Sequence, residues 1–137
     1  MSDFNKFHTP VLVVDDHPMM QEMLSHIIKQ LGFPQVFLAD NGNTAWPILM
    51  AKNIGLVLTD LNMPVLDGIE LIKSIRENPL TKDLPVVVIS CEGVPDKVME
   101  AIKAGADAFV VKPFSVETVK AKIVQALSRR RDQSTAD

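Results

Sequence analysis

The stretch VLVVDDHP at residues 11–18 places four apolar, mostly β-branched residues directly before two acids and a proline. An unbroken apolar run of this kind is typical of a strand that is buried on both faces, as in a parallel sheet. Pro18 suits the first turn of a helix, where a missing amide N–H costs little. The stretch therefore predicts a buried strand that leads into a crossover helix, with Asp15 and Asp16 between the two.

The same unit recurs four more times along the chain. Apolar runs alternate with stretches of helical period, which predicts a five-stranded parallel sheet with helices on both faces. The second run opens on a glutamine and holds fewer β-branched residues, so we expect it at a sheet edge, whereas the other four should be buried on both faces. The expected strands are residues 11–14, 35–39, 56–58, 86–89 and 108–111.

The expected helices fit between these strands. Gly32 is placed to end the first helix, and Asp67 forms a pair with Glu70 that is typical of a helix start, so we expect Asp67 to cap the third helix. Pro47 removes an amide donor, so the second helix should begin late or bend. The fourth helix should begin near Pro95 and the fifth after residue 115. The residues expected to face inward are Met20, Met23, Leu24, Ile27, Ile28 and Leu31, then Val98, Ala101 and Ile102, then Val119, Ile123 and Leu127.

Length and composition point to one soluble domain. The chain has 137 residues, 47% of them hydrophobic and 23% charged, and its single cysteine, Cys91, cannot form an internal disulfide. No apolar run is long enough to span a membrane, and a net charge of -3 argues against nucleic-acid binding. We therefore expect a cytoplasmic protein with an extension over residues 1–9, one domain over 10–128 and a disordered tail over 129–137.

Polar residues follow the predicted strands at the point where each strand ends. Asp15 and Asp16 follow the first strand, Asp60 the third, Ser90 the fourth and Lys112 the fifth. Open α/β sheets bind their ligands at this carboxyl edge. Three carboxylates so close together repel one another, so a cation is expected unless their pKa values rise. Mg²⁺ is the natural candidate, because it prefers oxygen ligands and is usually held by one or two carboxylates and a phosphate oxygen.

This constellation predicts phosphoryl chemistry. A carboxylate beside such a metal can attack a phosphoryl group and form an aspartyl phosphate. Lys112 would add a second positive charge near the phosphoryl oxygens, and the Ser90 hydroxyl could donate to one of them only after phosphorylation. The site would then act as a switch. Asp15 and Asp16 could instead cap the helix that Pro18 opens, and Lys112 could be a solvated turn residue.

Four motifs in order, VLVVDDHP, LVLTDLNMPVLDG, VVVIS and GADAFVVKPF, resemble those of receiver domains in two-component response regulators. The run AGADAFVVKPF is particularly similar to single-domain chemotaxis regulators of the CheY kind. The resemblance covers about residues 10–128 and implies a flavodoxin-like, doubly wound (βα)5 domain with strand order 2-1-3-4-5. It also implies a phosphoprotein, not an enzyme, that receives its phosphoryl group from a sensor histidine kinase or a histidine phosphotransfer protein and signals to a downstream protein as a monomer or weak dimer.

The resemblance implies a role for each site residue. Asp60 would be the phosphoacceptor, and Ser90 and Lys112 would contact the phosphoryl group, with the Lys112–Pro113 peptide bond cis. The implied Mg²⁺ ligands are Asp15 (largely through water), Asp16, Asp60 and the backbone carbonyl of Asn62.

A coupling path is also implied, in which Phe109 changes rotamer when Ser90 moves toward the phosphoryl group. This change would alter the face made by the fourth helix, the fifth strand and the fifth helix. Phe109 stands where similar regulators often have tyrosine, and it could also be a plain core residue. Cys91 follows Ser90 where the family usually has Ala or Gly, and we expect a small buried residue there rather than a redox group. Asn62 and Glu92 flank the site and resemble the pair that accompanies short-lived phosphorylation.

Other functions fit the sequence less well. A haloacid dehalogenase-type phosphatase would need a second acid two residues after Asp60, where Asn62 stands, and 137 residues leave little room for a substrate cap. A flavin or nucleotide module would need a glycine-rich loop after a strand, which is missing. A pseudo-receiver that signals through binding alone stays open as an alternative. The three histidines show no metal-ligand spacing and receive no role; they are His8, His17 and His26.

Overall fold

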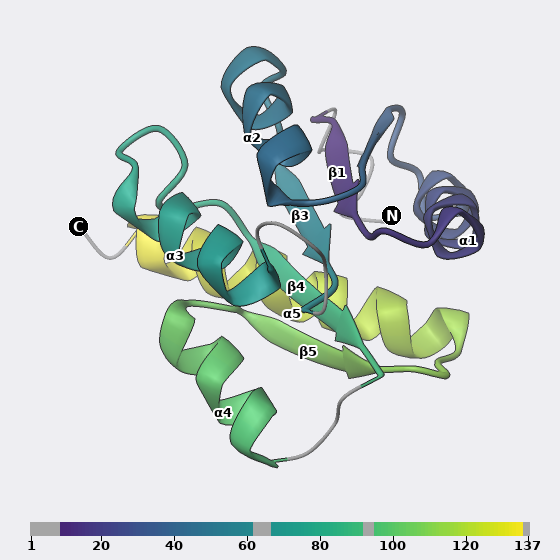
Figure 1. Ribbon diagram of the computed structural model, residues 1–137. Coiled ribbons are helices and arrows are strands. Elements are labelled where there is room, and N and C mark those ends of the chain that lie inside the picture. The colour runs from purple at the N-terminus through teal and green to yellow at the C-terminus, as the bar shows by residue number, and fades with distance from the viewer. Residues whose placement is uncertain (1–8, 62–66, 92–94, 136–137) are drawn as a thin grey trace.

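The computed structural model describes residues 9–61, 67–91 and 95–135, with side chains described as far as residue 130. Within these residues five strands alternate with five helices (Figure 1), and the strands form one parallel sheet of order β2-β1-β3-β4-β5. The flavodoxin-like α/β fold and the predicted strand order are therefore confirmed. The elements in chain order are β1 (Val11–Val14), α1 (Pro18–Gln30), β2 (Val36–Ala39), α2 (Gly42–Ala51), β3 (Leu56–Thr59), α3 (Gly68–Glu77), β4 (Val86–Ser90), α4 (Pro95–Ala104), β5 (Ala108–Val111) and α5 (Val116–Thr135).

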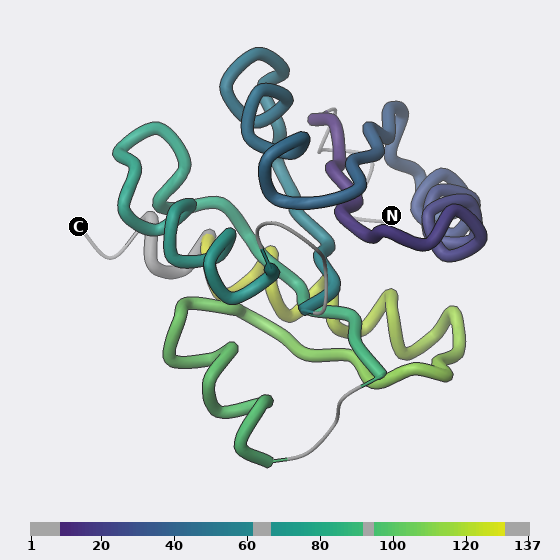
Figure 2. Tube along the Cα trace, in the orientation of Figure 1, coloured from purple at the N-terminus to yellow at the C-terminus, as the bar shows by residue number. Residues whose placement is uncertain are grey.

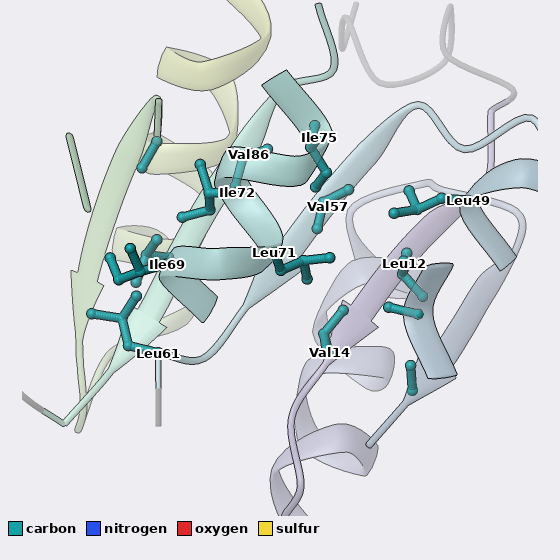
Figure 3. Packing of buried hydrophobic residues seen from close by; sticks show 14 of the residues in the cluster. Leu12, Val14, Leu49, Val57, Leu61, Ile69, Leu71, Ile72, Ile75 and Val86 are labelled. Carbon is teal, nitrogen blue, oxygen red and sulfur yellow. The ribbon is translucent and has the colours of Figure 1, made fainter. Parts of the chain in front are cut away.

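Alternate residues of each strand enter two separate apolar layers. On one face of the sheet Leu12 and Val57 pack with residues from α2, α3 and α4. On the other face Val11 and Leu56 pack with residues from α1 and α5. The chain path in Figure 2 shows how the first four helices each connect one strand to the next, and Figure 3 shows residues of α3 packed over the first of these faces. The helices thus bury both faces of the sheet, as the unbroken apolar runs predicted.

The parallel register brings the carboxyl ends of the strands to one edge. Val14, the last residue of β1, pairs with Ala39 of β2 on one side and Thr59 of β3 on the other. The backbone ladder continues one residue further, because the Asp60 N–H donates to the Val14 carbonyl at 2.9 Å. Asp15 and Asp60 therefore leave the sheet side by side.

Strand burial follows the predictions except in β5. Strands β1, β3 and β4 are fully buried, and β2 lies at a sheet edge as expected. The expectation that β5 is buried on both faces is wrong, because Phe109 is only half-buried and Val111 is 45% exposed. As the last strand in the sheet order, β5 has a strand neighbour on one side only.

Helix starts and ends depend on local capping. Pro18 is the first residue of α1, Gly32 follows that helix with φ +110°, and Asp67 Oδ1 accepts the Glu70 N–H at 2.9 Å, all as predicted. Of the two alternatives expected for α2, a late start or a bend, the structure excludes the late start. Asn41 and Thr44 form a reciprocal capping box that starts α2 at Gly42 and leaves Pro47 inside the helix.

Two residues expected to face inward are instead largely exposed. Met23 of α1 is 48% exposed and Ile102 of α4 is 43% exposed. Both lie on the border of the apolar stripe of their helix, so a large part of each side chain faces solvent. None of the described helices combines the length and the apolar character that a membrane span requires.

Helix α5 continues past residue 128, where we expected the domain to end. Residues 129–135 were expected to be disordered, but α5 extends to Thr135. Two arginines anchor the helix at residues 129 and 130: Arg130 Nε donates to Asp107 Oδ1 at 2.8 Å, and Arg129 Nε lies 3.2 Å from the same oxygen. Asp107 is fully buried just before β5, so these contacts hold this part of α5 against the amino edge of the sheet.

Candidate functional site

Three acids and a histidine meet at the carboxyl edge of β1 and β3. One ligand atom from each of Asp15, Asp16, His17 and Asp60 can be chosen so that all four lie within 4.8 Å of one another. Asp15 is 1% exposed and Asp60 is 4% exposed, so two of the carboxylates are almost removed from water. The predicted convergence of Asp15, Asp16 and Asp60 is therefore confirmed.

Lys112 bridges the two buried carboxylates. Its Nζ lies 3.2 Å from Asp15 Oδ2 and 3.3 Å from Asp60 Oδ2. Burial alone would lower the pKa of Lys112, but the charges of Asp60 and Asp15 outweigh it and raise that pKa above its ordinary value. The amine stays protonated at neutral pH. The Lys112–Pro113 peptide bond is cis, as the resemblance implied.

Backbone contacts hold Asp60 in place. Its Oδ1 accepts the N–H of Leu61 at 2.7 Å, and its Oδ2 faces Lys112. Helix α3 begins directly against this turn, because the Gly68 N–H donates to the Leu61 carbonyl at 3.0 Å. A Cβ atom at Gly68 would collide with the carbonyl oxygen of Asp60. The site thus requires glycine at the start of α3.

Asp16 presents an oxygen suited to a cation. Its Oδ1 is buried and has no hydrogen-bond partner within the described part of the chain, although His17 Nδ1 lies 3.1 Å away. A buried, unsatisfied carboxylate oxygen is costly unless a cation or another donor compensates it. Three carboxylates stand against the single charge of Lys112. This donor set fits a hard divalent cation such as Mg²⁺, which binds oxygen ligands.

His17 also belongs to the cluster, although no role was predicted for it. Its backbone N–H donates to Asp15 Oδ1 at 2.9 Å, and its ring Nδ1 lies 3.0 Å from the same oxygen. His17 shows no metal-ligand spacing to the other histidines, because its partners are the two residues immediately before it. A tight turn after β1 folds the imidazole back over Asp15, and only the backbone geometry reveals this contact.

The fourth and fifth strands supply the remaining predicted residues. Ser90 is fully buried at the end of β4, and its carbonyl accepts the Lys112 N–H at 2.9 Å. Phe109 pairs with Val88 of β4 and packs against the apolar layer under α2, α3 and α4. Cys91 is exposed, which contradicts the expectation of a small buried residue. Strand β4 ends at Ser90, so Cys91 already lies outside the sheet.

Two predicted residues lie outside the described part of the structure. They are Asn62, expected to offer its backbone carbonyl to a metal, and Glu92, expected to flank the site. Both roles stay predictions.

Comparison with known proteins agrees with this geometry. Residues 11–124 match the family described as "Response regulator receiver domain". The chain is 37% identical over 119 residues to the chemotaxis protein CheY of Pseudomonas aeruginosa, which covers 87% of this chain and 96% of that protein.

Solved structures show the same fold. The chemotaxis response regulator CheY4 of Vibrio cholerae superposes with a TM-score of 0.77 at 30% identity, covering 90% of this chain and 99% of that one. The receiver domain of the sensor histidine kinase PA1611 of P. aeruginosa, solved with a magnesium ion coordinated in its active-site cleft, has a TM-score of 0.79 at 21% identity and covers 89% and 99%. At that identity the second likeness concerns the fold alone.

Proposed function

Because the chain belongs to the response regulator receiver family, and is thus a signalling phosphoacceptor rather than an enzyme, we propose that Asp60 is the residue that receives the phosphoryl group. A receiver domain implies a histidine kinase as partner. The proposed donor is that kinase itself or a histidine phosphotransfer protein, acting in the cytoplasm.

The observation that carries the proposal is the position of Lys112 between two buried carboxylates. Asp60 Oδ2 and Asp15 Oδ2 both face its Nζ, while Asp60 Oδ1 is held by the Leu61 N–H. A phosphoryl group on Asp60 would place its oxygens beside this fixed positive charge. Charge-assisted contacts of this kind stabilise a transferring phosphoryl group.

The reaction follows from these positions. An oxygen of the Asp60 carboxylate attacks the phosphorus, and the phosphorus–nitrogen bond to the donor histidine breaks. The electron pair of that bond stays on the imidazole nitrogen, which takes up a proton. Lys112 Nζ would contact one phosphoryl oxygen, and the hydroxyl of Ser90 would donate to another.

Mg²⁺ is the proposed cofactor. Asp15, Asp16 and Asp60 would hold it together with the backbone carbonyl of Asn62, and Asp16 Oδ1 is the buried oxygen that supports this assignment. When bound, the ion would neutralise the carboxylates and screen the approach of an anionic donor.

The direct test is the intact mass of the purified chain after incubation with acetyl phosphate, with and without Mg²⁺. We expect one phosphoryl adduct with Mg²⁺ and none with EDTA, because three carboxylates repel an anionic donor unless a cation compensates them. An absence of adduct under both conditions would support the pseudo-receiver alternative.

We propose further that Phe109 couples the site to the face made by α4, β5 and α5, which a downstream protein would bind. A cleft of about 400 Å³ lies on this face, lined by Phe109, Val111, Ile102 and Lys122 among others. Phe109 is half-buried beside this cleft, so its ring has space to move outward. Ser90 and Val111 pair across β4 and β5, which joins the proposed switch residue to the same face.

Replacing Phe109 with alanine should uncouple this face from the site. In the native chain we expect acetyl phosphate and Mg²⁺ to change the hydrogen-exchange protection of α4 by 5- to 150-fold, which corresponds to a coupling of about 1–3 kcal/mol. In Phe109→Ala this change should be largely lost while the adduct still forms. The matched control is Phe37→Ala, which removes a partly buried ring at the opposite sheet edge that packs against the same apolar layer. An equal response in Phe109→Ala and the native chain would contradict the role of Phe109.

A further inference from the structure

The side chain of Gln21 reaches the ends of two strands. Its Nε2 lies 2.6 Å from the carbonyl oxygen of Asp15, 2.9 Å from Asp40 Oδ1 and 3.3 Å from the carbonyl oxygen of Ala39. Gln21 stands in the first turns of α1 and is partly buried. Asp15 follows β1 and Asp40 follows β2, so one amide group joins α1 to the carboxyl edge of both strands.

The orientation of this amide is fixed by its surroundings. The three neighbouring atoms are two backbone carbonyl oxygens and a carboxylate oxygen, and all three can only accept hydrogen bonds from an amide. The Gln21 nitrogen must therefore face them, since its oxygen would meet three acceptors. Asp40 is itself held, because its N–H donates to Thr44 Oγ1 in the cap of α2 at 3.1 Å.

The hydrogen bond from Gln21 to the Asp15 carbonyl affects the position of Asp16 as well as that of Asp15. That carbonyl belongs to the peptide group between Asp15 and Asp16, and a peptide group is planar. Holding its oxygen therefore also fixes the Cα position of Asp16. Asp15 has further contacts through His17 and Lys112, whereas Asp16 Oδ1 has no hydrogen-bond partner in the described residues and lies near one exposed group only, the His17 ring at 3.1 Å. The direction of the Asp16 carboxylate thus depends strongly on its backbone.

We propose that Gln21 is a positioning residue that sets the affinity of the acidic pair for Mg²⁺ by holding the Asp15–Asp16 peptide group. This inference rests on the proposed function, because it assigns a task to a residue behind the proposed metal site. Mg²⁺ requires near-ideal octahedral geometry, so a small rotation of Asp16 weakens binding. Loss of a residue that orients metal ligands typically costs 10- to 100-fold in affinity.

The test is calorimetric titration of Mg²⁺ into the native chain, Gln21→Met and Gln21→Glu. Both substitutions keep the length of the side chain and remove the amide donors. We expect Kd to rise 10- to 100-fold in each. Glutamate adds a negative charge near the site, which would tighten Mg²⁺ binding if Gln21 acted only through local charge. Weaker binding in both variants therefore separates positioning from electrostatics.

The matched control is Gln30→Met, the same substitution at the exposed end of α1. Its Kd for Mg²⁺ should equal the native value, and metal-free Gln21→Met should stay folded at the titration temperature, with its thermal midpoint lowered only moderately by the lost hydrogen bonds. Adduct formation in Gln21→Met should recover at saturating Mg²⁺. An unchanged Kd, or a Kd change matched by a large loss of stability in the metal-free protein, would overturn the positioning role alone. A native chain that binds no Mg²⁺ and forms no adduct would overturn both this inference and the proposed function.

Discussion

Asp60→Asn should give no phosphoryl adduct with acetyl phosphate and Mg²⁺, under conditions in which the native chain is modified. The amide has nearly the same shape as the carboxylate but is a poor nucleophile, so the variant should fold and fail only in the reaction. It also removes one of the two charges that face Lys112 at the site. Intact mass spectrometry measures the loss directly.

The matched control for this experiment is Asp67→Asn. Asp67 is exposed and caps α3 outside the acidic cluster, and asparagine is an equally good helix cap. Its adduct should form as in the native chain. If Asp60→Asn retained the adduct, another residue would be the phosphoacceptor, and peptide mapping would locate it.

The largest expected effect on stability is that of Asp107→Ala. The Asp107 side chain is fully buried, and its carboxylate accepts from Arg76 at 3.0 Å, from Arg130 at 2.8 Å and from the backbone N–H of Val86 at 2.9 Å. Removing one member of a buried ion pair leaves the other uncompensated, which typically costs about 3–5 kcal/mol. We expect a loss of this size in the free energy of unfolding, measured by urea denaturation.

Arg76 is a partly buried cation that Asp107 neutralises. Burial, followed by the nearby charge of Arg130, lowers the pKa of Arg76 to about 10, so its guanidinium is still charged at neutral pH and depends on Asp107. Arg76 also donates to the carbonyls of Lys82, Leu84 and Gly105, which ties α3 to the loops before β4 and β5. Without Asp107 this cation would stay buried without its carboxylate.

Glu100→Ala is the control for Asp107→Ala. Glu100 forms an exposed i,i+3 pair with Lys97 at 3.6 Å, and such surface pairs contribute about 0–1 kcal/mol. Its unfolding free energy should stay near the native value. A loss below about 1 kcal/mol in Asp107→Ala would mean that the arginines find other partners or reach water.

The sequence predicted those features that depend on residues close together in the chain. Unbroken apolar runs located the five strands, since a strand buried on both faces must be apolar at every position. The position of Asp15, Asp16 and Asp60 directly after strands then predicted the acidic cluster, because parallel strands end at one edge. Asp67 could be assigned as a cap since its partner stands only three residues away.

Features that need the tertiary arrangement were not predicted. Arg76 and Asp107 are 31 positions apart, and no periodic pattern links them. The arginines at 129 and 130 therefore resembled the start of a polar tail, although their partner is a buried carboxylate. The same holds for Gln21 and Asp40, which meet only because β2 lies beside β1.

The two polar clusters lie at opposite ends of the sheet, with Asp60 after β3 and Asp107 before β5. Strands of four or five residues separate them by about 13–17 Å, a distance at which substitutions usually add in free energy. Mutations near Asp60 could therefore alter the phosphoryl chemistry without weakening the contacts of Asp107 with Arg76 and Arg130. Those contacts could in turn offset stability that is lost through substitutions near Asp60. The phosphoryl chemistry and the folding stability of this protein could therefore evolve as two separate traits.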